Sequence, residues 1–153
     1  LFESYLQLFR LGIRHPDHMA QQISLLERTL TVPVTGYWKG RYGFGKPVFA
    51  AHDRMLLGQS RRRDILISAV FPVFWLYART TSQPDLEAYL VRLYNRFPAP
   101  GWNRITSTVA AQVFAERGNI PAELHTASLS QGMLHLYKQG CALPACASCP
   151  LGV

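Results

Sequence analysis

All three cysteines of the chain lie within nine residues near its C-terminal end, at positions 141, 146 and 149. This C-x4-C-x2-C spacing lets thiolates converge on one soft metal ion, because the two-residue loop brings Cys146 and Cys149 to the same side of a tight turn. With Cys141 they supply three ligands, one short of a tetrahedral site. The fourth ligand would be His135, a carboxylate, a group from another chain or no protein group. Such a ligand set favours zinc, because an iron–sulfur cluster with this spacing needs a distant fourth cysteine that the chain does not have.

Two other interpretations of the cysteine cluster stay open. The thiols could form a partly buried structural cap, or a redox centre in which one disulfide leaves one cysteine over. A disulfide framework is the least attractive version, since the rest of the chain has no cysteine and 153 residues can bury a core without cross-links. The sequence therefore predicts a reduced, cytoplasmic protein. If the cysteines bind a metal, we expect zinc rather than an iron–sulfur cluster, and if they do not, we expect no cofactor.

Most of the positive charge falls in one segment. The formal net charge is +7, and residues 36–64 contain seven basic side chains against two acidic ones. The basic residues are Lys39, Arg41, Lys46, Arg54, Arg61, Arg62 and Arg63. A block of this kind is typical of a surface that binds the phosphates of DNA or RNA, and also of a solvated face without a ligand.

The first part of this basic block mixes aromatic residues with glycine. Residues 36–47 contain four glycines and the rings of Tyr37, Trp38, Tyr42 and Phe44. So many glycines exclude a regular helix, because each costs about 1 kcal/mol relative to alanine. Exposed rings beside cations would stack bases while the cations bind phosphates. Alternatively, the rings anchor a long connection onto the core. The glycine spacing matches neither a P-loop nor a dinucleotide-binding loop.

The sequence offers no catalytic constellation. Asp85 and Glu87 follow Pro84 and fit the first turn of a helix, where they stabilise the helix dipole. His15 and His18 lie three residues apart around Asp17, but no further ligand follows nearby. We therefore assign no catalytic residue to this chain and leave open whether the protein is an enzyme.

The periodicity of the apolar residues predicts an all-α fold of five or six helices, forming one domain over residues 1–153 with a cysteine-rich tail at 141–153. We expect a central helix from Ile65 to Tyr77 that starts at Asp64 and buries Phe71, Phe74 and Leu76. The longest apolar run of the chain, from Ile65 to Ala78, is too short to span a membrane. Gly12 is expected to end the first helix, and Ser128 with Gln131 to form a capping box for the last. Because the chain lacks an initiator Met, we expect it to start within a longer protein.

A series of short motifs, in order from about Leu25 to the end, resembles the bacterial domain-of-unknown-function family 2851. The motifs are Tyr37-Trp38, Tyr42-Gly-Phe-Gly45, Leu57-Gly58, Ile65–Pro72, Tyr77-Ala78, Ser130-Gln131, the three cysteines and Gly152. Members look like longer proteins whose N-terminal half resembles restriction-endonuclease-like nucleases. The resemblance implies that the present chain is the helical C-terminal part of such a protein, with nucleic acid and that N-terminal part as partners.

Together, these patterns predict a noncatalytic helical module of a nuclease-like protein that contacts DNA or RNA. The expected contact residues are Tyr37, Trp38, Lys39, Arg41, Lys46, Arg61, Arg62 and Arg63. The alternative is a structural or protein-interaction domain whose basic face is incidental and whose cysteines form a small metal-binding or thiol cap.

Overall fold

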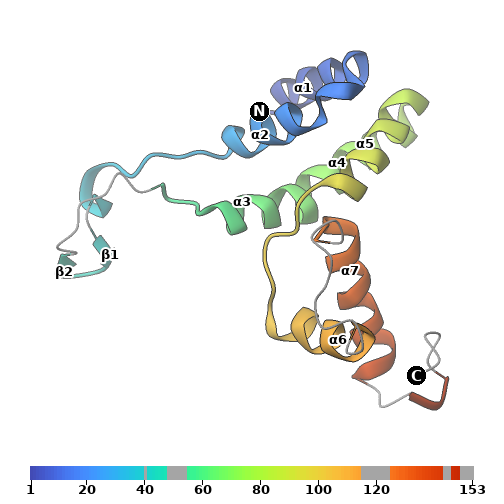
Figure 1. The fold of residues 1–153 in the computed structure, drawn as a ribbon. Coiled ribbons are helices and arrows are strands. Elements are labelled where there is room, and N and C mark those ends of the chain that lie inside the picture. Colours follow the sequence, from blue (N-terminus) through green and yellow to red (C-terminus); the bar gives the residue numbers. More distant parts are fainter. Residues whose placement is uncertain (40, 48–54, 115–124, 143–145, 149–153) are drawn as a thin grey trace.

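The computed structural model describes residues 1–39, 41–47, 55–114, 125–142 and 146–148, and these residues fold almost entirely into helices (Figure 1). The α-helices are α1 (Phe2–Arg14), α2 (Met19–Thr29), α3 (Gln59–Ile65), α4 (Phe71–Thr80), α5 (Pro84–Arg96), α6 (Arg104–Phe114) and α7 (Ala127–Leu136). Two short strands, β1 (Arg41–Gly43) and β2 (Lys46–Pro47), pair antiparallel. The all-α prediction is therefore confirmed, with a minimal hairpin inside the segment that was expected to be a loop.

The central helix is longer than its apolar pattern indicates. A π-helical turn, η3 (Leu66–Val70), joins α3 to α4, so the helix runs without a break from Gln59 to Thr80. Gly58 occupies the N-cap, and the expected start at Asp64 was wrong. In η3 the Phe71 N–H donates to the Leu66 carbonyl, five residues back. This wider turn comes directly before Pro72, which has no N–H to donate and whose ring would crowd the preceding turn of a regular α-helix.

Aromatic side chains from α1, α4 and α5 form the centre of the core. Phe74 packs edge-on against Phe9, with ring centroids 5.0 Å apart, and Phe71 does the same against Phe97 at 5.0 Å. All four rings are buried, as expected for Phe71 and Phe74. Leu76 was expected to join them but is 58% exposed, because it lies on the opposite face of α4 with Val73. The central helix is therefore buried on one side only.

The first helix does not end at Gly12. It continues to Arg14, and Gly12 is buried where α1 meets α5. A β-carbon at this position would lie 2.0 Å from the hydroxyl oxygen of Tyr89, far closer than atoms can approach. Glycine is present here because the Tyr89 ring occupies the space of a side chain, and this close contact outweighs the low helix propensity of glycine.

Helices α6 and α7 form a smaller unit with its own core of Val109, Ala110 and Met133. Backbone hydrogen bonds join it to the end of α5: Ala99 donates to the His125 carbonyl at 3.0 Å, and Ala127 donates to the Phe97 carbonyl at 2.7 Å. The N-cap of α7 is Thr126, whose hydroxyl accepts from the Leu129 N–H. The predicted capping box at Ser128 was wrong, because the N-cap lies two residues earlier, at Thr126, which places Ser128 in the first turn of the helix.

The chain between α2 and α3 leaves the helical body as an extended arm, defined here as residues 32–39, 41–47, 55 and 56 (Figure 1). At its base the Leu56 N–H donates to the Val32 carbonyl at 2.9 Å, and Pro33 pairs with Met55. At its far end lie a 3-10 turn, η2 (Gly36–Trp38), and the β1–β2 hairpin. None of the helices in the described part of the chain is long and apolar enough to cross a membrane.

The contact between Gly12 and Tyr89 generates a stability prediction. We expect Gly12→Ala to lower the free energy of unfolding by about 1–3 kcal/mol, because the methyl group forces Tyr89 out of its position in the core. Gly132→Ala in α7 is the matched control: its β-carbon would meet no atom within 4 Å, so it should stabilise by up to about 1 kcal/mol. Urea unfolding of both variants tests this, and equal effects at the two glycines would contradict it.

Candidate nucleic-acid interface on the arm

Three aromatic rings cluster at the tip of the arm. The centroids of Tyr37 and Trp38 are 5.3 Å apart, those of Trp38 and Phe44 are 5.3 Å apart, and those of Tyr37 and Phe44 are 5.9 Å apart. The hydroxyl oxygen of Tyr37 accepts a hydrogen bond from the Gly45 N–H at 3.0 Å, and Gly45 adopts a positive φ of 73°. This hydrogen bond joins η2 to the hairpin turn and so fixes the position of these two segments relative to each other.

The rings of this aromatic cluster face solvent rather than the core. Trp38 is 40% exposed and Phe44 is 83% exposed, and Tyr37 is exposed as well. The structure thus does not support the alternative in which Tyr37, Trp38 and Phe44 anchor a long connection onto the helical body. Phe44 was noted in the sequence but not included among the expected contact residues. Its position between Gly43 and Gly45 was the available signal, because a turn flanked by glycines projects its central side chain into solvent.

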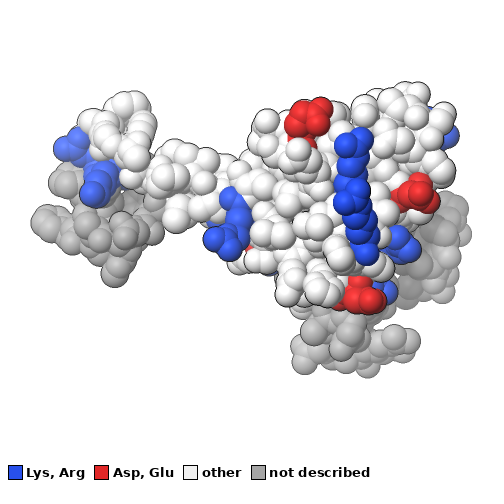
Figure 2. Space-filling model, turned by 90° about the horizontal axis from the view of Figure 1, so that it is seen from above, with Lys and Arg blue, Asp and Glu red and all other residues white. Residues whose placement is uncertain are grey.

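Basic side chains accompany the rings. The guanidinium of Arg41 lies over the Tyr37 ring, 4.5 Å from its centroid, in a cation–π contact. Lys39 is exposed next to Trp38. Lys46 belongs to β2, but its side chain lies outside the described part of the structure. Figure 2 shows basic side chains on the arm and a second group on the helical body.

The three consecutive arginines do not form one surface. Arg61 is exposed, with its Nη1 3.7 Å from the Asp64 carboxylate. Arg63 turns inward, where its Nε donates to Glu27 Oε1 at 2.5 Å and its Nη1 to the Ala99 carbonyl at 3.3 Å. Arg62 donates from Nη1 to the Thr31 hydroxyl at 2.8 Å, at the point where the arm begins. Of the three, only Arg61 therefore has the exposed, solvent-facing position that the sequence pattern indicated for all of them.

The C-terminal cysteines are described only in part. Cys141 is a partly exposed free thiol at the end of η6 (Tyr137–Cys141), a π-helical continuation of α7. Cys146 starts the 3-10 turn η7 (Cys146–Ser148), without a described side chain, and Cys149 lies outside the described residues. Within the described ranges no three His, Cys, Asp or Glu side chains come together as metal ligands. Metal binding at Cys141, Cys146 and Cys149 remains a prediction.

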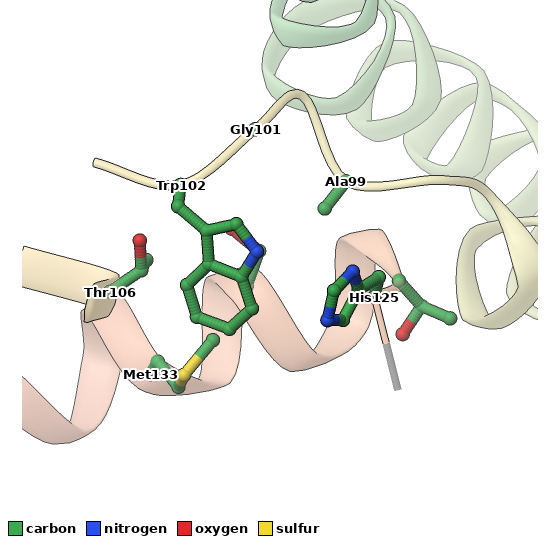
Figure 3. A pocket seen from close by; sticks show the side chains of 8 residues that line it. Ala99, Gly101, Trp102, Thr106, His125 and Met133 are labelled. Atoms are coloured by element: carbon green, nitrogen blue, oxygen red, sulfur yellow. The ribbon is translucent and has the colours of Figure 1, made fainter. Parts of the chain in front are cut away.

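A small pocket lies beside α7 (Figure 3). The Trp102 ring and the His125 ring, which line it, meet edge-on with centroids 5.2 Å apart, and Thr106, Ser130 and Met133 also contribute to its lining. The empty space is about 180 Å³, including its open side. Pockets that bind small organic molecules usually enclose about 300–1,000 Å³. The size of this pocket therefore does not favour a substrate site.

Among the described residues, the titratable groups with a perturbed pKa are tyrosines in the core or packed against it. Burial raises the pKa of Tyr5, Tyr89 and Tyr94 above the ordinary value of 10.0. Such phenols stay protonated at neutral pH, so these shifts do not create a general base. Asp85 and Glu87 lie in the first turn of α5, as predicted, and Glu87 approaches Arg79 at 3.8 Å. The aromatic and basic tip of the arm is therefore the best-defined candidate site in the described structure.

Comparison with known proteins gives one match. The family model described as "Protein of unknown function (DUF2851)" matches residues 12–101, which include α1 from Gly12 onward, α2, the arm, α3, α4 and α5. Ser130-Gln131 and the cysteines lie outside the matched range. No curated protein and no solved structure matches the chain. The family match covers more than half of the chain, and the protein thus belongs to the domain-of-unknown-function family 2851.

Proposed function

We propose that this chain is a noncatalytic helical module of a nuclease-like protein, and that it contacts single-stranded nucleic acid with the tip of its arm. The observation that carries the proposal is the cluster of Tyr37, Trp38 and Phe44, three exposed rings in mutual contact beside Arg41 and Lys39. The family resemblance supports it, because members look like nucleases in their N-terminal half. The helical body serves to hold the arm in position.

Base stacking is the interaction that the tip offers. Each exposed base stacked on an aromatic ring contributes about 1–3 kcal/mol, with little dependence on sequence. One face of Tyr37 already lies against Arg41, so Trp38 and Phe44 are the rings available for bases. An 83% exposed phenylalanine is unfavourable in water, since burial of its ring would gain about 1.5–3 kcal/mol. A stacked base would cover this ring.

Phosphate contacts would come from the cations beside the rings. Arg41 and Lys39 lie next to the stacking surface, and Arg61 is exposed on α3, which follows the arm in the chain. Arg63 is excluded from this role because its guanidinium is bonded to Glu27 and Ala99. The proposed site therefore uses fewer cations than the block in the sequence contains, and its salt dependence should be correspondingly moderate.

The stacking proposal is tested with fluorescently labelled oligothymidylate and oligouridylate at low salt. We expect Trp38→Ala and Phe44→Ala each to weaken binding by about 5- to 150-fold, as the loss of one stacked base predicts. Lys39→Gln and Arg41→Gln should each reduce the slope of log affinity against log salt by about one. Trp102→Ala is the matched control, because Trp102 is also 40% exposed but lies off the arm.

Two results would count against this function. One is the absence of binding to both oligonucleotides at low salt. The other is an equal loss of affinity in Trp38→Ala and Trp102→Ala, which would show that the arm has no special role.

A protein-interaction module is the second candidate function, favoured by the exposed apolar face of α4. Val73 and Leu76 are 53% and 58% exposed, and Ala69 and Pro72 are exposed on the same helix. Soluble proteins that expose apolar patches often use them to contact other proteins. In a longer protein this face could receive the N-terminal part of the same chain.

Sedimentation velocity tests the α4 face. If it binds protein surfaces, the isolated chain should self-associate as its concentration rises, and Val73→Ser with Leu76→Ser should abolish this association. Val91→Ser is the control, because Val91 is also exposed but lies on α5. A chain that stays monomeric at every concentration, or a control that behaves like the double variant, would argue against this role.

Zinc binding by Cys141, Cys146 and Cys149 is a separate proposal, supported by their spacing in the sequence. Protein purified without oxygen should contain close to one equivalent of zinc, and replacement of any one of the three cysteines by serine should remove it. Strong visible absorbance would instead identify an iron–sulfur cluster. Metal-free protein whose three thiols react as ordinary cysteines would leave the cluster a structural cap.

A further inference from the structure

Arg62 is an incompletely paired cation at the base of the arm. Its Nη1 donates to the neutral hydroxyl of Thr31 at 2.8 Å, while its Nε is shielded from solvent and has no hydrogen-bond partner. Among the described residues no carboxylate lies within ion-pair distance of it. A partly buried guanidinium with one neutral partner is unusual, because removing a charge from water is unfavourable unless an opposite charge compensates for it.

Arg63, the next residue in the helix, has the carboxylate partner that Arg62 lacks in the described structure. Arg63 is held by Glu27 Oε1, and the other carboxylate oxygen of Glu27 accepts from Gln59 Nε2 at 2.9 Å. Both oxygens of Glu27 are thus occupied, and neither is bonded to Arg62. Asp64 lies beside Arg61 instead. Two adjacent arginines on one helix therefore differ: Arg63 is paired with an internal carboxylate, and Arg62 is paired with none in the described part of the chain.

We propose that Arg62 binds a phosphate of the same nucleic-acid strand whose bases stack at the tip of the arm. This inference rests on the proposed function and adds a second contact point to it. A guanidinium donates from its Nη groups to phosphate oxygens, and a phosphodiester supplies the negative charge that would compensate the charge of Arg62. The bond to Thr31 fixes the guanidinium where the arm leaves the body, so one strand can follow the arm from base to tip.

The length of the arm sets the length of the ligand. The six residues from Val32 to Tyr37 span at most roughly 20–22 Å when extended. Phosphates in one strand of B-form DNA advance about 3.4 Å per nucleotide, and an unstacked single strand extends further, so roughly six nucleotides is the largest number needed to reach from the tip to Arg62. A dinucleotide would occupy the tip alone, and an oligonucleotide of about twelve nucleotides would reach both contact points.

The test compares Arg62→Gln with the unchanged protein on these two lengths of oligothymidylate. For the longer one we expect an affinity loss of about tenfold and a salt slope lower by about one. For the shorter one the affinity should not change. Arg62→Lys, which keeps the charge but not the planar guanidinium, should recover part of the loss. Arg96→Gln is the control for net charge, because Arg96 is exposed at the end of α5, away from the arm in the sequence.

The outcomes separate this inference from the proposed function. If neither length binds, or if Trp38→Ala has no effect on the short one, the proposed function itself fails. If both lengths bind and Arg62→Gln matches Arg96→Gln on the longer one, only the role of Arg62 is overturned. The midpoint of urea unfolding checks for structural damage: Arg62→Gln should leave it nearly unchanged, and a large decrease without a change in affinity would make Arg62 a structural residue.

Discussion

The partly buried ion pair between Arg63 and Glu27 connects three parts of the molecule that are distant in the sequence. It joins α3 to α2, and through the Ala99 carbonyl it also reaches the segment that leads from α5 to α6. The arm starts after α2 and ends before α3, so this pair determines where the two ends of the arm meet the body. Removal of one partner would leave the other charge partly buried and uncompensated, which is far more harmful than loss of an exposed pair.

The aromatic core makes this arrangement rigid. Phe9, Phe71, Phe74 and Phe97 pack edge-on from three parts of the chain, and Gly12 lets α1 approach the Tyr89 ring on α5. Such packing leaves little freedom to α4, which is joined through η3 to α3 and its arginines. The rigid body and the extended arm therefore perform different tasks: the body supplies the stability, and the arm presents rings and cations to solvent.

This division explains why the proposed contacts lie where little of the chain is buried. A stacking platform must keep its rings exposed until a base covers them, so it cannot contribute its apolar area to the core. Because its rings are not buried in the core, the tip is stabilised by local interactions instead. These are the hydrogen bond from Gly45 to Tyr37, the cation–π contact of Arg41 and the contacts between the rings. The α4 face is different, because there exposed Val73 and Leu76 lie on a helix whose other side, with Phe71 and Phe74, is buried in the core.

Much of this protein can be predicted from its sequence, because helical periodicity and glycine content are local properties. The all-α class, helix α5 after Pro84, the buried Phe71 and Phe74, and the irregular segment between α2 and α3 all follow from them. Residue order does not show which face of an all-apolar helix meets another element, so Leu76 was wrongly expected in the core. Nor does it reveal partners distant in the chain. Gly12 continues a helix because Tyr89 lies against it, and the three consecutive arginines differ because Glu27, Thr31 and Asp64 approach them from different directions. Charge and ring type are thus encoded locally, whereas exposure and pairing depend on contacts between distant residues that only the tertiary structure creates.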